Sequence, residues 1–177
     1  TDEAAVQRTF SKWQLYLGFF GFGLGILMGL AQALERIGVD IYNALQLESY
    51  YQGLTLHGVS LALVFTFTFA NGFLTLTVMH GFDRPMAHTR LVKLSFWLAA
   101  TGVALAAAAI LLNKATVLFT FYTPMEAHTA FYLGAVLLVV STWLTLLNQL
   151  LTLKAWRADN PGARIPLLSF VSIITFL

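Results

Sequence analysis

Four long stretches without Asp, Glu, Lys or Arg constrain the fold of this sequence more than any other feature. They run from Trp13 to Leu34, from Leu54 to Met79, from Leu94 to Leu112 and from Thr129 to Leu153. A helix needs about 20 apolar residues to cross a bilayer, and a helix satisfies all of its own backbone hydrogen bonds in lipid. The sequence therefore predicts an all-α polytopic membrane protein, with four transmembrane helices in a single membrane domain over residues 1–177.

A fifth apolar run begins at Pro166 and continues to Leu177. A helix of this length rises only about 18 Å, which is too short for a crossing. We therefore expect this run to be the start of a fifth helix, truncated at Leu177, and the whole chain to be part of a larger helix bundle.

The amino-acid composition agrees with a lipid environment. Hydrophobic residues make up 58% of the chain and charged residues only 10%, whereas soluble domains are about a quarter charged. The net charge of +2 gives no indication of nucleic-acid binding. The absence of cysteine excludes disulfides, iron–sulfur clusters and thiolate metal sites within this stretch. Any metal or cofactor must therefore be held by His, Asp, Glu, Tyr or Met.

The basic residues predict how the chain is oriented. One side of the membrane receives eight of the ten: Arg8, Lys12, Arg84, Arg90, Lys93, Lys154, Arg157 and Arg164. The other side receives only Arg36 and Lys114. The positive-inside rule therefore predicts a cytoplasmic amino terminus. The outer side then carries an interfacial aromatic belt, consisting of Tyr42, Tyr50, Tyr51 and Tyr122.

His57 lies one turn inside the outer end of the second predicted helix. Ionisable residues inside a membrane are costly and tend to be functional. One interpretation is a histidine that forms a hydrogen bond with a neighbouring helix. The other is an axial ligand of haem iron, because imidazole is a common axial ligand and Gly58 leaves room beside it for a flat macrocycle. The residues alone leave both interpretations open.

Small and polar residues follow one face in several predicted helices. Gly21, Gly25 and Gly29 are spaced four apart in the first, so another helix or a cofactor plane could approach the backbone closely there. Helix packing is the more frequent cause of such a stripe. The alanines at 106–109 predict close packing of the third helix. Interhelical polar contacts are expected from one face of the fourth: Ser141, Thr145, Asn148 and Thr152.

The other three histidines offer weaker candidates. His80 and His88 fall in a cytoplasmic loop and are expected to be solvated. His128 starts the fourth helix at a depth similar to that of His57. The two could clamp one haem between the second and fourth helices, which would make the chain a self-contained bis-histidine cytochrome. No Asp or Glu lies within the predicted spans, which argues against a complete proton-driven transporter.

Two stretches resemble subunit I of the B-type haem–copper oxygen reductases, a group of cytochrome c oxidases. The first is residues 49–58 around His57, and the second is residues 115–135, which contain the Thr-Phe-Tyr-x-Pro sequence at 120–124. Gly25 with Gly29 and the sequence Ser-Thr-Trp at 141–143 fit the same pattern. The resemblance covers almost the whole chain. One departure is Thr123-Pro124, where the family has two prolines.

This resemblance implies the amino-terminal part of a terminal oxidase subunit, which reduces oxygen to water with electrons from cytochrome c and couples this to proton translocation. In the family, the histidine that opens helix two is an axial ligand of the low-spin haem, and His57 occupies that position. Gly25, Gly29 and Tyr122 are the further expected cofactor-binding positions. The low-spin haem is expected to be b-type, and its second ligand, the high-spin haem and the copper are expected beyond Leu177.

The resemblance also implies partners and leaves alternatives. The expected partners are a copper-bearing subunit II, a cytochrome c type electron donor and the lipid bilayer of a prokaryotic plasma membrane. A nitric oxide reductase subunit has a similar histidine and differs in helices six and seven. A small bis-histidine b-type membrane cytochrome, with His57 and His128 as ligands, is the alternative of a different class.

Overall fold

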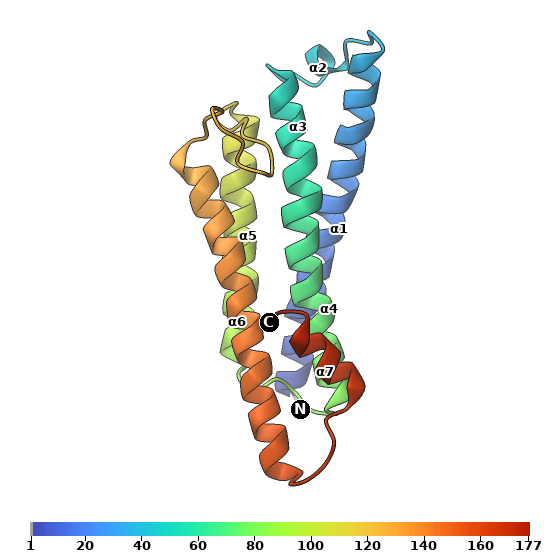
Figure 1. The fold of residues 1–177 in the computed structure, drawn as a ribbon, viewed down its shortest axis with the longest axis vertical. Helices are drawn as coiled ribbons and strands as arrows, with labels where there is room; N and C mark the ends of the chain where they lie inside the picture. Colours follow the sequence, from blue (N-terminus) through green and yellow to red (C-terminus); the bar gives the residue numbers. More distant parts are fainter. Residues whose placement is uncertain (1) are drawn as a thin grey trace.

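The computed structural model describes residues 2–177, which are mostly helical. Four helical spans are long and apolar enough to cross a membrane: α1 (Asp2–Arg36), a second span (Tyr50–Gly81), α5 (Thr89–Leu111) and α6 (Thr129–Asp159). They run along the long axis of the molecule (Figure 1). The prediction of an all-α membrane protein with four spanning helices is therefore confirmed.

Each of the four spans extends beyond its apolar stretch at one end or both. α1 begins at Asp2 rather than near Trp13, and α6 continues past Leu153 to Asp159. Asp2 and Glu3 lie in the first turn of α1, where acidic side chains stabilise a helix by interacting with the positive end of its dipole. Hydropathy marks the segment of a helix that is suited to lipid and does not mark where the helix ends. The charged turns therefore remain helical outside the apolar stretch.

The second span consists of three consecutive helical segments. They are α3 (Tyr50–Gly58), the π-helix η1 (Val59–Phe65) and α4 (Thr66–Gly81). A π-turn inserts extra residues relative to an α-helix and thereby rotates the faces on either side of it; such segments are frequent at functional sites. The π-helix begins two residues after His57, so it sets how that side chain faces relative to α4.

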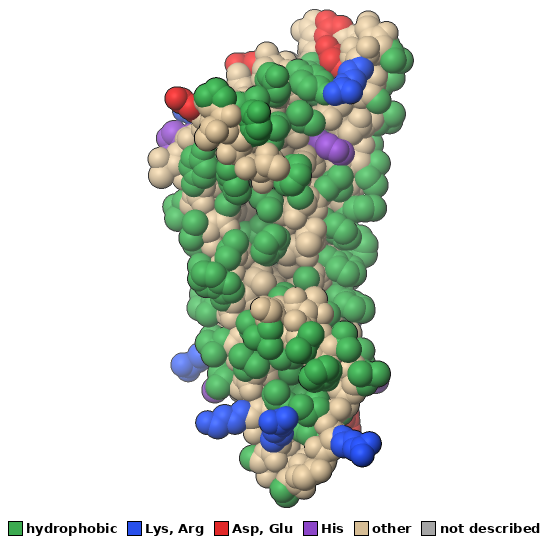
Figure 2. Space-filling view, viewed as in Figure 1, with side chains coloured by type: hydrophobic (Ala, Val, Ile, Leu, Met, Phe, Trp, Pro, Cys, Tyr) green, Lys and Arg blue, Asp and Glu red, His purple; other side chains and the backbone are tan. Residues whose placement is uncertain are grey.

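The shorter helices lie at opposite ends of the bundle. α2 (Ile41–Ala44) connects α1 to α3 at one end, called here the α2 end. α7 (Leu167–Ile174) follows α6 at the other end, called here the α7 end, and lies beside α4 (Figure 1). The side chains along the bundle are largely hydrophobic, and most of the visible basic side chains gather at the α7 end (Figure 2).

α5 and α6 approach each other closely through two glycines. A Cβ atom added at Gly102 would lie 2.5 Å from the carbonyl oxygen of Gly134, and one added at Gly134 would lie 2.5 Å from that of Gly102. Ala106 and Ala109 of α5 are buried near this contact. Without a hydrophobic driving force in lipid, such close backbone packing holds helices together. The expected close packing of this alanine-rich helix is confirmed.

The polar face of α6 forms the interhelical contacts that its spacing predicts. Ser141 accepts from Asn71 of α4, and Thr145 shares a hydrogen bond of 2.8 Å with Ser95 of α5. Asn148 accepts from the backbone N–H of His88 and donates to its carbonyl oxygen. These pairs tie α6 to α4 and to the start of α5.

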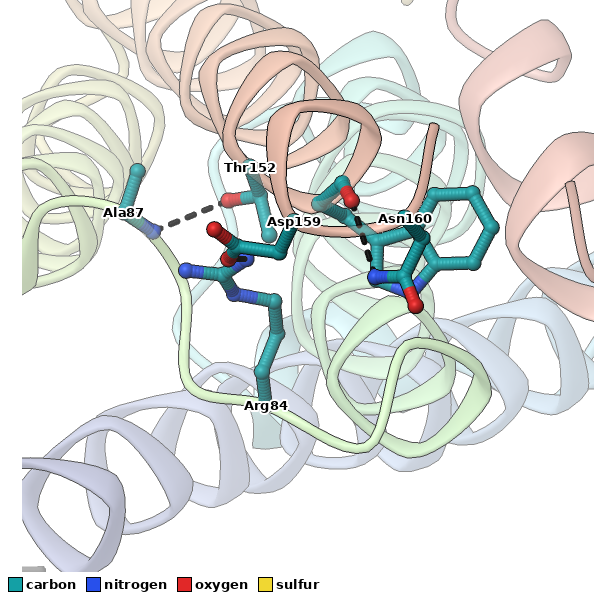
Figure 3. A network of polar contacts seen from close by, with 6 residues as sticks. Arg84, Ala87, Thr152, Asp159 and Asn160 are labelled. Carbon is teal, nitrogen blue, oxygen red and sulfur yellow. Dashed lines mark hydrogen bonds and ion pairs between the residues drawn. The ribbon is translucent and has the colours of Figure 1, made fainter. Parts of the chain in front are cut away.

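The loop before α5 is fixed to α6 at two points. Thr152 accepts from the N–H of Ala87, and Arg84 forms an ion pair of 2.8 Å with Asp159 (Figure 3). Gln7 of α1 holds the same loop from the opposite side, because its amide donates to the carbonyl oxygen of Met86 and accepts from the N–H of Met86. The loop is therefore anchored by α1 and α6 together.

Candidate functional site

His57 is held by the backbone of the neighbouring helix. Its Nδ1 lies 2.6 Å from the carbonyl oxygen of Gly25 in α1. A carbonyl oxygen can only accept, so Nδ1 carries the proton and Nε2 carries the lone pair in the neutral ring. The side chain is half-buried. The interpretation of His57 as a residue that forms a hydrogen bond with a neighbouring helix is therefore confirmed. This bond is compatible with the interpretation as a haem ligand, because a hydrogen bond through Nδ1 also orients a metal-ligating imidazole.

Two glycines of α1 make room for this ring. A Cβ atom added at Gly29 would lie 2.7 Å from Cε1 of His57 and 3.0 Å from its Nδ1. One added at Gly25 would lie 2.5 Å from Cγ of Leu61, so any larger residue would push the helices apart there. The glycine stripe therefore serves helix packing and, at its α2 end, forms a cradle against the imidazole.

The space beside Gly58 is not open. A Cβ atom added at Gly58 would lie 2.8 Å from Cδ1 of Phe119, so the aromatic ring of the 112–128 loop fills the position expected for a macrocycle. The same loop is tied to α3, because the N–H of Leu118 donates to Thr55 at 3.0 Å. The loop therefore covers one side of α3. The contacts of His57 with the carbonyl of Gly25 and of Gly58 with the ring of Phe119 could not be predicted from the sequence, because neither follows from spacing along the chain.

Comparison with known families shows which family the chain belongs to. The family model described as Cytochrome C and Quinol oxidase polypeptide I matches residues 9–177. The chain belongs to this family. The match begins within α1 and covers the other three spans and α7.

Individual members of the oxidase polypeptide I family agree with this assignment. A cytochrome c oxidase subunit 1 from Thermus thermophilus is 40% identical over 181 residues, which is 99% of this chain and 32% of the relative. A chain of a heme-copper terminal oxidase dimer solved by cryo-EM matches with a TM-score of 0.84 and 31% identity, over 99% of this chain and 30% of the other. The chain therefore spans about a third of the length of these two oxidase chains.

Among the other histidines of the chain, His128 takes a local role. Its Nδ1 accepts from the N–H of Ala130 and so caps α6. α6 packs mainly on α5, which also contacts α3. His80 and His88 are exposed at the α7 end, as expected of solvated residues. His57 is thus the histidine that the fold places in a cradle.

Tyr122 lies in the 112–128 loop and is 59% exposed. Its backbone N–H donates to the carbonyl oxygen of Val117, which shapes the loop that also carries Phe119. Its expected contact with a cofactor remains a prediction.

Tyr42, expected only as part of the aromatic belt, lies near the site. It is 5% exposed and its ring packs against Gly53, one turn before His57 on α3. Burial raises the pKa of the Tyr42 phenol above its ordinary value, and the neighbouring Tyr50 and Glu35 act in the same direction, while Gln32 opposes them. The neutral ring holds α2 over the start of α3, which fixes the helix that carries His57.

Proposed function

We propose that this chain is the amino-terminal part of the catalytic subunit of a B-type terminal oxidase, which reduces oxygen to water with electrons from cytochrome c and couples this to proton translocation. Within it, His57 supplies one axial ligand of a low-spin, b-type haem. The observation that carries the proposal is the bond from Nδ1 of His57 to Gly25, which leaves Nε2 as the ring nitrogen with a free lone pair.

The orientation and tautomer of His57 suit an iron ligand, whereas Phe119 fills the space beside Gly58. Metal-ligating histidines almost always donate their other ring N–H to a carbonyl, carboxylate or water, which fixes the tautomer and makes the ligating nitrogen more basic. Gly25 provides that acceptor and Gly29 provides the space for the ring. When bound, the haem would take up and pass on single electrons, and the axial ligand and its hydrogen bond would tune its potential. The task of the chain's own residues is to hold the imidazole in one orientation.

The orientation of the chain supports a route for electrons from outside. The positive-inside rule predicts a cytoplasmic α7 end, with His57 near the outer surface of a prokaryotic plasma membrane. A copper-bearing subunit II that receives electrons from a cytochrome c type donor would approach this outer surface. The high-spin haem, the copper and the second ligand of the low-spin haem are then supplied by the remainder of a subunit about three times as long.

The oxidase assignment is favoured over the alternatives by two observations. The family model and the two relatives are described as oxidases, which favours an oxidase over a nitric oxide reductase. Nδ1 of His128 accepts from the N–H of Ala130, so in the neutral ring its proton lies on Nε2 and neither nitrogen offers a free lone pair. This difference from His57 favours His57 as a single ligand over a His57–His128 pair.

Replacing His57 tests the proposal in the complete oxidase. We expect His57→Ala to abolish the low-spin haem absorption and to remove one haem per oxidase, whereas the matched control His128→Ala keeps both. Haem content is measured by extraction and the ligation state by optical and electron paramagnetic resonance spectra, so the result does not depend on turnover. An unchanged low-spin spectrum in His57→Ala would refute the assignment. Loss of that spectrum in both variants would favour the bis-histidine alternative.

A further inference from the structure

A small polar hollow lies inside the four-helix bundle, on the α7 side of the cradle. Its walls come from α1, α4, α5, α6 and the loop before α5: Ser11, Gln14, Thr75, Met86, Leu91, Val92, Ser95, Thr145 and Asn148. The space open to the centre of a water molecule is about 10 Å³. A hollow of roughly this size holds one water when it also offers two to four polar partners.

Two polar atoms of α1 in this hollow have no partner among the described residues. They are the hydroxyl oxygen of Ser11, a residue that is 2% exposed, and Oε1 of Gln14, a residue that is 3% exposed. Ser11 and Gln14 are three positions apart, so both face the hollow from the same side of α1. The cost of leaving a buried polar group unpaired is about 1–3 kcal/mol. Two such groups that line one hollow point to a ligand that satisfies both.

The neighbouring hydrogen bonds restrict how the amide of Gln14 is placed. Its Nε2 donates to the hydroxyl of Ser95 at 3.1 Å. Ser95 in turn donates to the carbonyl oxygen of Ser141 and shares a hydrogen bond with Thr145. With the nitrogen of Gln14 engaged on α5, its oxygen is left as an acceptor without a protein donor.

We infer that one ordered water molecule is bound in this hollow, where it donates to Oε1 of Gln14 and forms a hydrogen bond with the hydroxyl of Ser11. Thr75 of α4 brings a third polar group to the same space. Three hydrogen bonds are typical of a buried water. Water is the ligand because the space admits a single small molecule and the atoms without partners are uncharged.

This water links α1 to α4 beside a point where the two helices are closely packed. A Cβ atom added at Gly72 of α4 would lie 2.6 Å from the carbonyl oxygen of Ser11. The direct side-chain hydrogen bonds around the hollow run from α1 to α5, from α5 to α6 and from α4 to α6. A water held by Ser11, Gln14 and Thr75 adds a link between α1 and α4 to the same network.

The test is a density map of the complete oxidase at a resolution that shows ordered waters elsewhere in the subunit. We expect a peak within hydrogen-bond distance of Ser11 Oγ and Gln14 Oε1. In Ser11→Ala the peak should weaken or vanish and the thermal midpoint should fall, whereas the control Thr101→Val, at an exposed position of α5, should leave both unchanged. An empty hollow in the wild-type map, or an unchanged peak in Ser11→Ala, would overturn the inference.

Discussion

The imidazole of His57 is oriented by the main chain of α1, because its Nδ1 lies 2.6 Å from the carbonyl oxygen of Gly25. This carbonyl is normally directed along its own helix, and a side chain reaches it only where the two helices are close. Gly25 and Gly29 allow that approach, since a Cβ atom at either position would collide with α3 or η1. Sequence positions 32 residues apart are thereby joined into one site.

Gly29→Ala is expected to disturb the proposed haem ligand without removing it. The added methyl group would lie 2.7 Å from Cε1 of His57, whereas carbon atoms in contact are about 3.5–4.0 Å apart. The ring must therefore tilt and weaken its bond to Gly25, and loss of such a supporting contact typically lowers metal affinity about 10–100-fold. We expect a shifted or diminished low-spin haem spectrum and lower haem occupancy in the purified oxidase.

The matched control for this variant is Gly23→Ala on the same helix. A Cβ atom at Gly23 meets nothing within 4 Å, so the spectrum and the haem content should be retained. Equal losses in the two variants would indicate a general effect of alanine in α1 and would contradict a specific role of Gly29.

Gln7→Ala is expected to release the loop before α5. Gln7 is fully buried and makes two hydrogen bonds to the backbone of Met86 and one to Thr89. Its removal leaves the N–H and carbonyl of Met86 unpaired at a buried position, which costs about 1–3 kcal/mol for each group. Hydrogen exchange of the Met86 amide should accelerate, and the thermal midpoint should fall. Thr9→Ala, which removes only an exposed bond within α1, should change neither.

The sequence predicts the spans well because lipid imposes a simple requirement. Each apolar stretch must satisfy its own backbone hydrogen bonds and therefore forms a helix. The helix ends are less predictable, since the charged turns at Asp2 and Asp159 stay helical beyond the apolar stretches. The polar face of α6 follows from its spacing, but the partner of Asn148, the backbone of His88, does not, because it depends on where α5 begins.

The candidate site is likewise predictable from the sequence only in part. His57 is conspicuous in the sequence because an ionisable residue in a span is costly. Its geometry is not predictable, because it depends on the π-helix at Val59–Phe65 and on a carbonyl oxygen that every residue possesses. The ring of Phe119 beside Gly58 is a loop contact, and hydropathy and helical periodicity carry no information about it.

Gly102→Val is expected to separate α5 from α6. The two glycines bring the backbones so close that any side chain at Gly102 overlaps the carbonyl of Gly134, and overpacking of this kind costs about 1–3 kcal/mol or more. The thermal midpoint of the oxidase should fall, and its size-exclusion profile should show more aggregate. Ala104→Val adds a similar volume at an exposed position of α5 and should have little effect. A stable Gly102→Val oxidase would show that α5 and α6 do not depend on the close contact between Gly102 and Gly134.

Asp159→Asn is expected to have a small effect that depends on salt. The ion pair with Arg84 is short, at 2.8 Å, but the Asp159 side chain is 67% exposed (Figure 3). Exposed pairs contribute about 0–1 kcal/mol and are screened by added salt. The thermal midpoint should fall slightly at low ionic strength and match that of the wild type at high ionic strength. Thr152→Val, which removes the buried acceptor of the Ala87 N–H in the same network, should destabilise the protein at both ionic strengths. A large loss in Asp159→Asn that persists in high salt would show that the ion pair, rather than the buried hydrogen bonds, anchors the loop.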